Sequence, residues 1–220
     1  MSIRTLIARH PKLTGMAFWT VNHLPFNNSI RKKGNKITGG LMTRCRIRIR
    51  GSNNQIILGS GTWLHKCKLT IKGSNCRIVI GDDSVIRQGD LYIEDDGGQI
   101  IVGHRTAIYG NTHLACIEGK TISIGDDGLI SSNVTMRVGD SHSILDLEGN
   151  RINPSQDVQI ADRVWIGNQV TILKGAKVPE DAVIATGAIV TKQFYQTGIV
   201  LGGNPAKVIK ENIRWDKKRL

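Results

Sequence analysis

The feature that most constrains the fold is a six-residue repeat of aliphatic side chains. Stepping by six from residue 160 meets an unbroken aliphatic column, and a column of small residues follows its first five members at a spacing of four. The first column is Ile160, Ile166, Ile172, Val178, Ile184 and Val190; the second is Val164, Val170, Ala176, Ala182 and Ala188. A helix cannot keep this period in phase, because it turns once in 3.6 residues. The repeat therefore predicts short strands separated by corners.

The same pattern recurs upstream inside a longer period. Column members Leu58, Ile80, Val102 and Ile124 lie 22 residues apart, which is three hexads plus a short turn rich in Gly, Asp, Asn and Lys. We predict an all-β fold, a triangular parallel β-helix whose aliphatic side chains stack inward from coil to coil. The aromatic content of only 5% agrees, because the interior of such a coil is too narrow for rings.

The register breaks once. Ile124 and Ile160 are 36 residues apart, 14 more than one coil, which predicts an excursion loop over residues 143–156. A long loop that leaves a regular scaffold is usually functional, and a neutral insertion is the alternative. Cys45 and Cys67 are 22 residues apart, so we expect a buried packing ladder rather than a disulfide.

The two ends lack the repeat. We predict an N-terminal capping segment at 1–36, the β-helix at 37–200 and a basic tail at 201–220, formed as a short helix or an extension. A solenoid end needs a cover. We expect a short capping helix that carries Met16, Trp19, Val21 and Leu24.

The charge balance points to anionic partners. The chain has 30 Lys and Arg against 18 Asp and Glu, a net charge of +12, which favours nucleic acid, membrane lipid or phosphorylated small molecules as partners, with a solvated basic surface as the alternative. A contact of the basic N-terminal segment with a membrane surface is a further alternative. With no long apolar run and no secretion signal, we expect a cytoplasmic protein.

Several strings resemble known sequence motifs. The segments at residues 160–170, 187–192 and 203–209 read IADRVWIGNQV, GAIVTK and GNPAKVI, and they resemble motifs of the hexapeptide-repeat acyltransferases. GDSHSI at 139–144 and NRIN at 150–153 resemble the capsular-polysaccharide and sialic-acid O-acetyltransferases of that family. The resemblance implies a left-handed coil, a homotrimer with its sites between subunits, acetyl-CoA as co-substrate and no metal.

The candidate catalytic residue is a histidine at the start of the excursion. Acetyl transfer needs a base for the hydroxyl proton, and His suits neutral pH. His142 lies six residues after Met136, where the excursion opens, and it matches the histidine that the family uses as general base. His113 is the runner-up. Ser141 and Ser143 flank His142 but point to the opposite face of a strand, so we expect direct transfer without an acyl-enzyme.

The resemblance also implies coenzyme and acceptor contacts. Trp165 would line the groove near the base, the two tail lysines would meet the coenzyme phosphates, and Asn111 would lie near the acceptor. The implied coenzyme-binding residues are Trp165, Asn168, Thr186, Thr191, Lys192, Lys207 and Lys210. Either Asp140 or Asp146 is a candidate to orient the imidazole of His142.

The expected function is acetyl-CoA-dependent O-acetyl transfer to a sugar hydroxyl of a cell-surface polysaccharide or its precursor, with no nucleic acid as partner. One alternative is an N-acetyltransferase that acts on an amino sugar. Another is a non-catalytic β-helix that binds an anion or a glycan. A zinc enzyme like the γ-class carbonic anhydrases is disfavoured, because His104 and His113 are nine residues apart and no closer pair exists.

Overall fold

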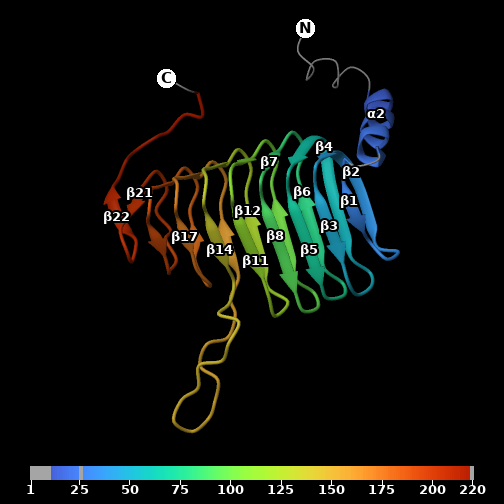
Figure 1. Ribbon diagram of the computed structural model, residues 1–220. Helices are drawn as coiled ribbons and strands as arrows, with labels where there is room; N and C mark the ends of the chain where they lie inside the picture. The colour runs from blue at the N-terminus through green and yellow to red at the C-terminus, as the bar shows by residue number, and fades with distance from the viewer. Residues whose placement is uncertain (1–10, 25–26, 219–220) are drawn as a thin grey trace.

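The protein is a stack of triangular coils preceded by one helix (Figure 1). Its computed structural model describes residues 11–24 and 27–218. Helix α2 (Pro11–His23) comes first, and every later element of the described chain is a β-strand. The strands form three flat faces, which we call faces A, B and C, and the chain turns a corner between one face and the next.

Face A is a parallel sheet of eight strands. Its strands are β1 (Ser29–Arg31), β3 (Arg46–Ile49), β5 (Lys68–Lys72), β8 (Asp90–Glu94), β11 (His113–Cys116), β14 (Thr135–Arg137), β17 (Thr171–Ile172) and β20 (Ile189–Val190).

Faces C and B follow face A in each coil. In the first two coils β2 (Lys36–Thr43) and β4 (Gln55–His65) bend from face C into face B, which links both faces into one 14-stranded sheet. Face C continues with β6 (Arg77–Ile80), β9 (Gln99–Val102), β12 (Thr121–Ile124), β15 (Val158–Ile160) and β18 (Lys177–Val178). Face B continues with β7 (Val85–Arg87), β10 (Ala107–Ile108), β13 (Leu129–Ile130), β16 (Trp165–Ile166), β19 (Val183–Ile184), β21 (Val200–Gly202) and the antiparallel β22 (Lys207–Lys210).

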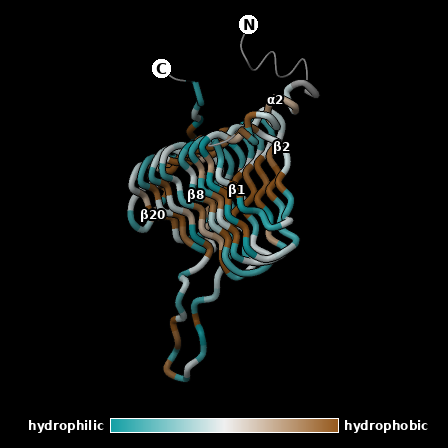
Figure 2. Tube along the Cα trace, turned by 45° about the vertical axis from the view of Figure 1, so that its right-hand side comes forward, coloured by the Kyte–Doolittle hydropathy of each residue, from teal (hydrophilic) through white to brown (hydrophobic). Residues whose placement is uncertain are grey.

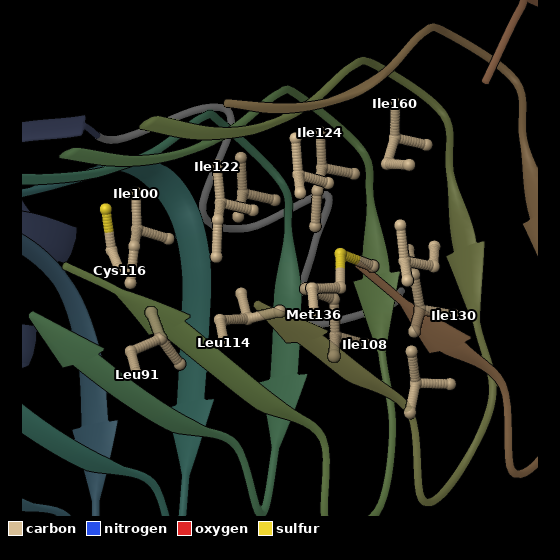
Figure 3. Close-up of a cluster of buried hydrophobic side chains, with 14 of the residues drawn as sticks. Leu91, Ile100, Ile108, Leu114, Cys116, Ile122, Ile124, Ile130, Met136 and Ile160 are labelled. Atoms are coloured by element: carbon tan, nitrogen blue, oxygen red, sulfur yellow. The ribbon is translucent and has the colours of Figure 1, made fainter. Parts of the chain in front are cut away.

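The core consists of aliphatic ladders that run through the stack. Ile56, Ile78, Ile100 and Ile122 lie in register on successive strands of face C, and each is 0% exposed. Figure 3 shows the side chains of several ladders filling the interior. Burial of each such side chain contributes roughly 1.5–3 kcal/mol. The predicted inward columns, and with them the triangular β-helix, are confirmed.

The thiols join this core. Cys45 and Cys67 are buried and free, as are Cys76 and Cys116. The predicted packing ladder without a disulfide is therefore confirmed.

The corner between faces C and B is built from left-handed residues stacked in a column. Asp83, Arg105, Asp127, Arg163 and Asp181 have φ between 53° and 59°. Their side chains pair along the stack, with Arg105 and Arg163 each 2.7 Å from the carboxylate in the next coil, Asp127 and Asp181 respectively. Non-glycine residues rarely adopt this conformation. Here each corner is held by the strands on both sides, and the ion pairs add contacts between coils.

Helix α2 covers the first coil, but with different residues from those predicted. Asn22 is buried; its amide donates to Gly40 O at 3.0 Å and its oxygen accepts from Met42 N at 2.7 Å. The edge strand β2 leaves backbone groups without a strand partner, which a polar side chain satisfies better than an apolar one. The predicted helix is confirmed, but three residues expected to cover the coil are exposed: Met16, Trp19 and Leu24.

The C-terminal segment is a strand followed by an extended strap. β22 pairs with β21, and no helix occurs between residues 201 and 218. The indole of Trp215 then donates to Arg163 O at 2.6 Å, and Lys217 Nζ donates to Arg105 O at 2.5 Å. The strap thus runs back along the corner between faces C and B, so the extension is observed and the alternative helix is not.

Other expectations about the chain as a whole are still open. The division at 1–36, 37–200 and 201–220 stays a prediction, and β1 inside the first range already pairs with β3. In the described residues, no helix combines the length and the apolar character needed to cross a bilayer. The cytoplasmic location also stays a prediction.

Candidate functional site

The excursion is an arm that leaves the corner between faces A and C. Residues 139–157, between β14 and β15, project away from the stack as the long loop of Figure 1. At its root Gln156 N donates to Val138 O at 2.8 Å, and halfway along Ile152 N donates to Ile144 O at 2.9 Å. The arm is therefore an antiparallel ribbon rather than an irregular loop.

The tip of the arm is organised by one carboxylate. Asp146 accepts from Glu148 N at 3.0 Å and from Asn150 N at 2.8 Å, and these bonds, those from Asn150 first, lower the pKa of Asp146. Leu147 beside it is completely exposed. Figure 2 shows further apolar residues on the arm outside the solenoid. Asp146 is thus committed to the tip turn, and we do not propose it as the residue that orients His142.

The root of the arm is organised by a buried asparagine. Asn153 Nδ2 donates to His142 O at 2.9 Å and to Asp140 Oδ2 at 2.8 Å. Its Oδ1 accepts from Ile144 N at 2.7 Å. Both amide hydrogens and the amide oxygen are therefore used. Asn153, which is only 6% exposed, therefore ties the backbone of His142 and Ile144 to the side chain of Asp140.

The neighbouring coils anchor this root from both sides. Glu118, in the preceding coil, forms an ion pair of 2.6 Å with Arg151, and Lys174, in the following coil, donates to Asp140 Oδ2 at 2.5 Å. Lys174, and after it Asn153, holds the pKa of Asp140 below its usual range; Arg151 does the same for Glu118. Both carboxylates are therefore ionised at neutral pH.

His142 itself presents an open imidazole. Its side chain is exposed, and in the described part of the chain its ring makes no hydrogen bond or ion pair. Asp140, the other candidate to orient the ring, is engaged by Lys174 and Asn153. The chain thus positions His142 through its backbone, and the ring is available to a second molecule. Its role as general base stays a prediction.

His113, the runner-up, lies elsewhere. It points outward from face A, with its Nδ1 3.6 Å from Asp90 Oδ2, and Lys68 reaches the same oxygen at 3.1 Å. His113, before Lys68, lowers the pKa of Asp90. The imidazole of His113 thus belongs to a charged cluster on a regular strand, away from the arm.

Trp165 lies on β16 and points outward from face B. Leu129 and Val183 are its register neighbours in the adjoining coils. Its side chain is 40% exposed, and its ring centroid lies 6.1 Å from that of Trp215 in the C-terminal strap. The two indoles form an aromatic surface on this face.

Three of the predicted residues share the corner between faces B and A. Asn168 and Thr186 follow β16 and β19 in successive coils, and both are exposed. A Cβ on Gly167 would lie 2.8 Å from Thr186 N, so glycine is needed for these coils to approach. Asn111 lies further up the same corner and donates to Asn133 at 3.4 Å.

The remaining residues divide between two edges. Lys207 and Lys210 are exposed on β22 beside face B. Thr191 and Lys192 follow β20 at the corner between faces A and C, the corner that also carries His142. Within a single chain, His142 and Trp165 therefore lie apart, because face B is opposite the corner between faces A and C.

The sequence did not reveal the residues that hold the arm root. Asn153 lies in the NRIN string that supports the resemblance, but nothing in the string indicates its contacts with His142, Asp140 and Ile144. Glu118 is 33 residues from Arg151, and Lys174 is 34 residues from Asp140. A periodic pattern cannot reveal pairs of this kind, which only the stacking of coils brings together. In the described residues no group of three or more His, Cys, Asp or Glu side chains could hold a metal ion.

Comparison with known proteins gives sequence and structural relatives, while no family model matches the chain. The chain is 38% identical over 95 residues to a polysialic acid O-acetyltransferase of Escherichia coli O1:K1 / APEC, a match that covers 43% of this chain and 31% of that protein. The chain thus spans about a third of the length of this curated relative.

Two crystal structures resemble nearly the whole chain. The polySia-specific acetyltransferase NeuO matches with 30% identity and a TM-score of 0.81, over 88% of this chain and 84% of that one. The polysialic acid O-acetyltransferase OatWY matches with 29% identity and a TM-score of 0.76, over 88% and 92%. Together with the hexad columns and the stacked coils, these matches show that the chain belongs to the hexapeptide-repeat acyltransferase family, with its left-handed β-helix.

Proposed function

We propose that this protein transfers an acetyl group from acetyl-CoA to a sugar hydroxyl of a cell-surface polysaccharide or its precursor. The observation that carries the proposal is the arm root, where Asn153 holds the backbone of His142 and the exposed imidazole has no partner among the described residues. The three similar proteins named above are all acetyltransferases for polysialic acid, which supports a glycan acceptor.

His142 acts as general base in this proposal. Its ring accepts the proton of the sugar hydroxyl as the oxygen attacks the thioester carbon. The carbon–sulfur bond then breaks, the acetyl group stays on the sugar oxygen, and the proton passes to the departing thiolate. No serine needs to carry the acetyl group, so the transfer is direct within a ternary complex.

The coenzyme site in this proposal takes residues from two chains. His142 lies at the corner between faces A and C, whereas Trp165, Asn168 and Thr186 lie on face B and its corner with face A. A homotrimer places the corner between faces A and C of one subunit, which carries His142, against face B of its neighbour, which carries Trp165. Thr191 and Lys192 would contribute from the His142 edge. On the other edge, Lys207 and Lys210 would pair with the coenzyme phosphates, and Asn111 would contact the acceptor.

Replacement of the base tests the chemistry. His142→Ala should lower kcat at least about a hundredfold, because positioned general bases contribute roughly 10²–10⁴-fold. The affinity for acetyl-CoA should change little. The matched control is His104→Ala, since His104 is an exposed histidine in a regular corner, where its Nδ1 accepts from Asp82 N at 3.0 Å and lies 3.4 Å from Asp82 Oδ2. The assay measures release of the free thiol of CoA with a panel of sugar acceptors. Equal rates in wild type and His142→Ala would contradict the role of His142.

Co-expression tests the shared site. His142→Ala and Trp165→Ala chains should each be nearly inactive alone, and trimers that contain both should regain part of the activity. Recovery is expected because, in a mixed trimer, some sites combine the intact His142 of a Trp165→Ala subunit with the intact Trp165 of a His142→Ala subunit. No recovery in an assembly of trimeric mass would show that each site lies within one chain.

A further inference from the structure

The basic charge of this protein is concentrated at one end of the solenoid. Residues 1–81 contain 15 of the 30 Lys and Arg residues and none of the 18 Asp and Glu residues; Asp82 is the first acidic side chain. The other 139 residues carry 15 basic and 18 acidic side chains. The net charge of +12 therefore arises at the N-terminal end alone.

The basic side chains of the first two coils are exposed and lack carboxylate partners. In the part of the chain that the structure describes, none of them forms an ion pair or a side-chain hydrogen bond. Like charges even face each other, because Arg31 of β1 is in register with Arg48 of β3. Such pairs destabilise a sheet, so folding does not explain them. The set is Arg31, Lys32, Lys33, Lys36, Arg44, Arg46, Arg48 and Arg50.

The contrast with the next coils on the same face is sharp. Lys68 lies 3.1 Å from Asp90, and Lys72 lies 3.2 Å from Glu94. In the third coil, both lysines of face A thus have a carboxylate partner in the next coil. Burial, and then the positive charges of its neighbours, Lys66 foremost, lower the pKa of His65 in the second coil. The end of the stack that carries α2 therefore combines a high density of exposed basic side chains with a complete lack of acidic residues up to Asp82.

The same end exposes apolar side chains. On and just after α2, Met16 is 69% exposed, Trp19 is 65% exposed and Leu24 is 50% exposed. A hollow of about 490 Å³ lies between the helix and the first coil. Its lining includes Phe18, Trp19, Ile30, Ile37, Met42 and, at the basic side, Lys32.

This combination distinguishes two classes of anionic partner. A soluble polyanion needs only the basic side chains. An anionic bilayer uses both, because lysine and arginine attract its headgroups while tryptophan and other apolar residues enter the interface. Tryptophan is also enriched at membrane–water interfaces.

We propose that the N-terminal end of the solenoid, made of α2 and the first two coils, docks this protein on an anionic lipid bilayer. Trp19 and Met16 enter the headgroup region, and the eight exposed basic residues lie against the lipid phosphates. This inference is independent of the proposed function, since it involves the end of the stack rather than the arm.

Vesicle sedimentation with the full-length protein tests the proposal. The protein should sediment with vesicles of equal parts phosphatidylcholine and phosphatidylglycerol and should stay in solution with phosphatidylcholine alone. Binding should weaken as salt screens the charges. Lys32→Glu with Lys33→Glu should weaken binding about tenfold or more, because each basic residue near an anionic surface contributes appreciably. Trp19→Ser should weaken it about threefold or more by removing the interfacial ring.

A charge-matched control separates a defined surface from general attraction. Arg214→Glu with Lys218→Glu makes the same charge change on two exposed residues outside the first two coils, and it should leave binding at the wild-type level. Equal loss in both double variants would overturn the proposal. Binding to dextran sulfate without binding to vesicles would also overturn it, in favour of a polyanion site. Acetyl transfer to a soluble acceptor by Lys32→Glu with Lys33→Glu should match wild type, so this test and that of the proposed function fail separately.

Discussion

The stacked coils and the arm are stabilised in opposite ways. The coils bury aliphatic ladders in which each side chain meets a like residue in the next coil, as Ile100 and Ile122 do. The arm exposes its aliphatic residues and depends on one buried asparagine with ion pairs to Glu118 and Lys174 on either side. The difference teaches that the repeated coils provide the stability of the fold, whereas the arm, which interrupts the repeat, positions His142. Each should therefore be breakable without the other.

The largest effect should come from a cavity in the ladder. Ile122→Ala removes a side chain that is 0% exposed at the centre of face C, and it should destabilise the fold by about 2–5 kcal/mol. Urea unfolding followed by circular dichroism measures this loss. At low temperature, where the variant is folded, kcat should stay near the wild-type value. A destabilisation below about 1 kcal/mol would mean that the ladder relaxes around the cavity.

The converse experiment removes the centre of the arm root. Asn153→Ala leaves His142 O, Ile144 N and Asp140 without this partner, and it should lower kcat about tenfold or more by releasing the backbone of His142. KM for acetyl-CoA should not change, because Asn153 positions the base and touches no substrate in this proposal. The cost in global stability should be about 1–3 kcal/mol. Asn53→Ala is the matched control, because Asn53 lies in a regular corner of an early coil, where its side chain donates to Asn75 at 2.7 Å. An unchanged kcat would show that the arm root needs no asparagine.

Acid should affect the arm before the coils. Ion pairs lower the pKa of Asp140 and of Glu118. Both carboxylates therefore contribute fully to stability at a pH above the ordinary carboxyl pKa, and this contribution is lost as the pH falls through their lowered pKa values. The protection of the arm amides against hydrogen exchange, relative to the intrinsic exchange rate at the same pH, should therefore fall below about pH 4, while the ladder amides stay protected. Lys174→Ala should shift this onset to higher pH. The same onset in wild type and variant would exclude Lys174 as the anchor.

The smallest effect should come from the tip. Leu147 is completely exposed, and Leu147→Ser should change the stability of the isolated chain by no more than about 0.5 kcal/mol. Thermal unfolding measures this, and mass measurement checks the assembly. A clear fall in melting temperature, or dissociation of the assembly, would show that the tip packs against another chain. The arm would then stabilise the assembly as well as position His142.

The fold followed from the sequence because each coil repeats the same local requirement. The column from Ile160 to Val190 and the earlier members Leu58, Ile80 and Val102 were all found buried. The position of the excursion followed as well, since any extra segment shifts a strict period. Prediction was poorer at the ends. The capping helix was found, but Asn22 covers the coil where apolar residues were expected, because the edge strand there offers free backbone groups.

By itself, the sequence determined that this chain folds into stacked triangular coils and that the stack is interrupted just after residue 142. Only the tertiary structure decided what holds that interruption in place and which edge carries each predicted site residue. The physical reason lies in the range of the contacts. A ladder repeats one local interaction and leaves a period in the sequence, whereas the pairs of Arg151 with Glu118 and Lys174 with Asp140 each occur once, between residues that the stacking of coils alone brings together.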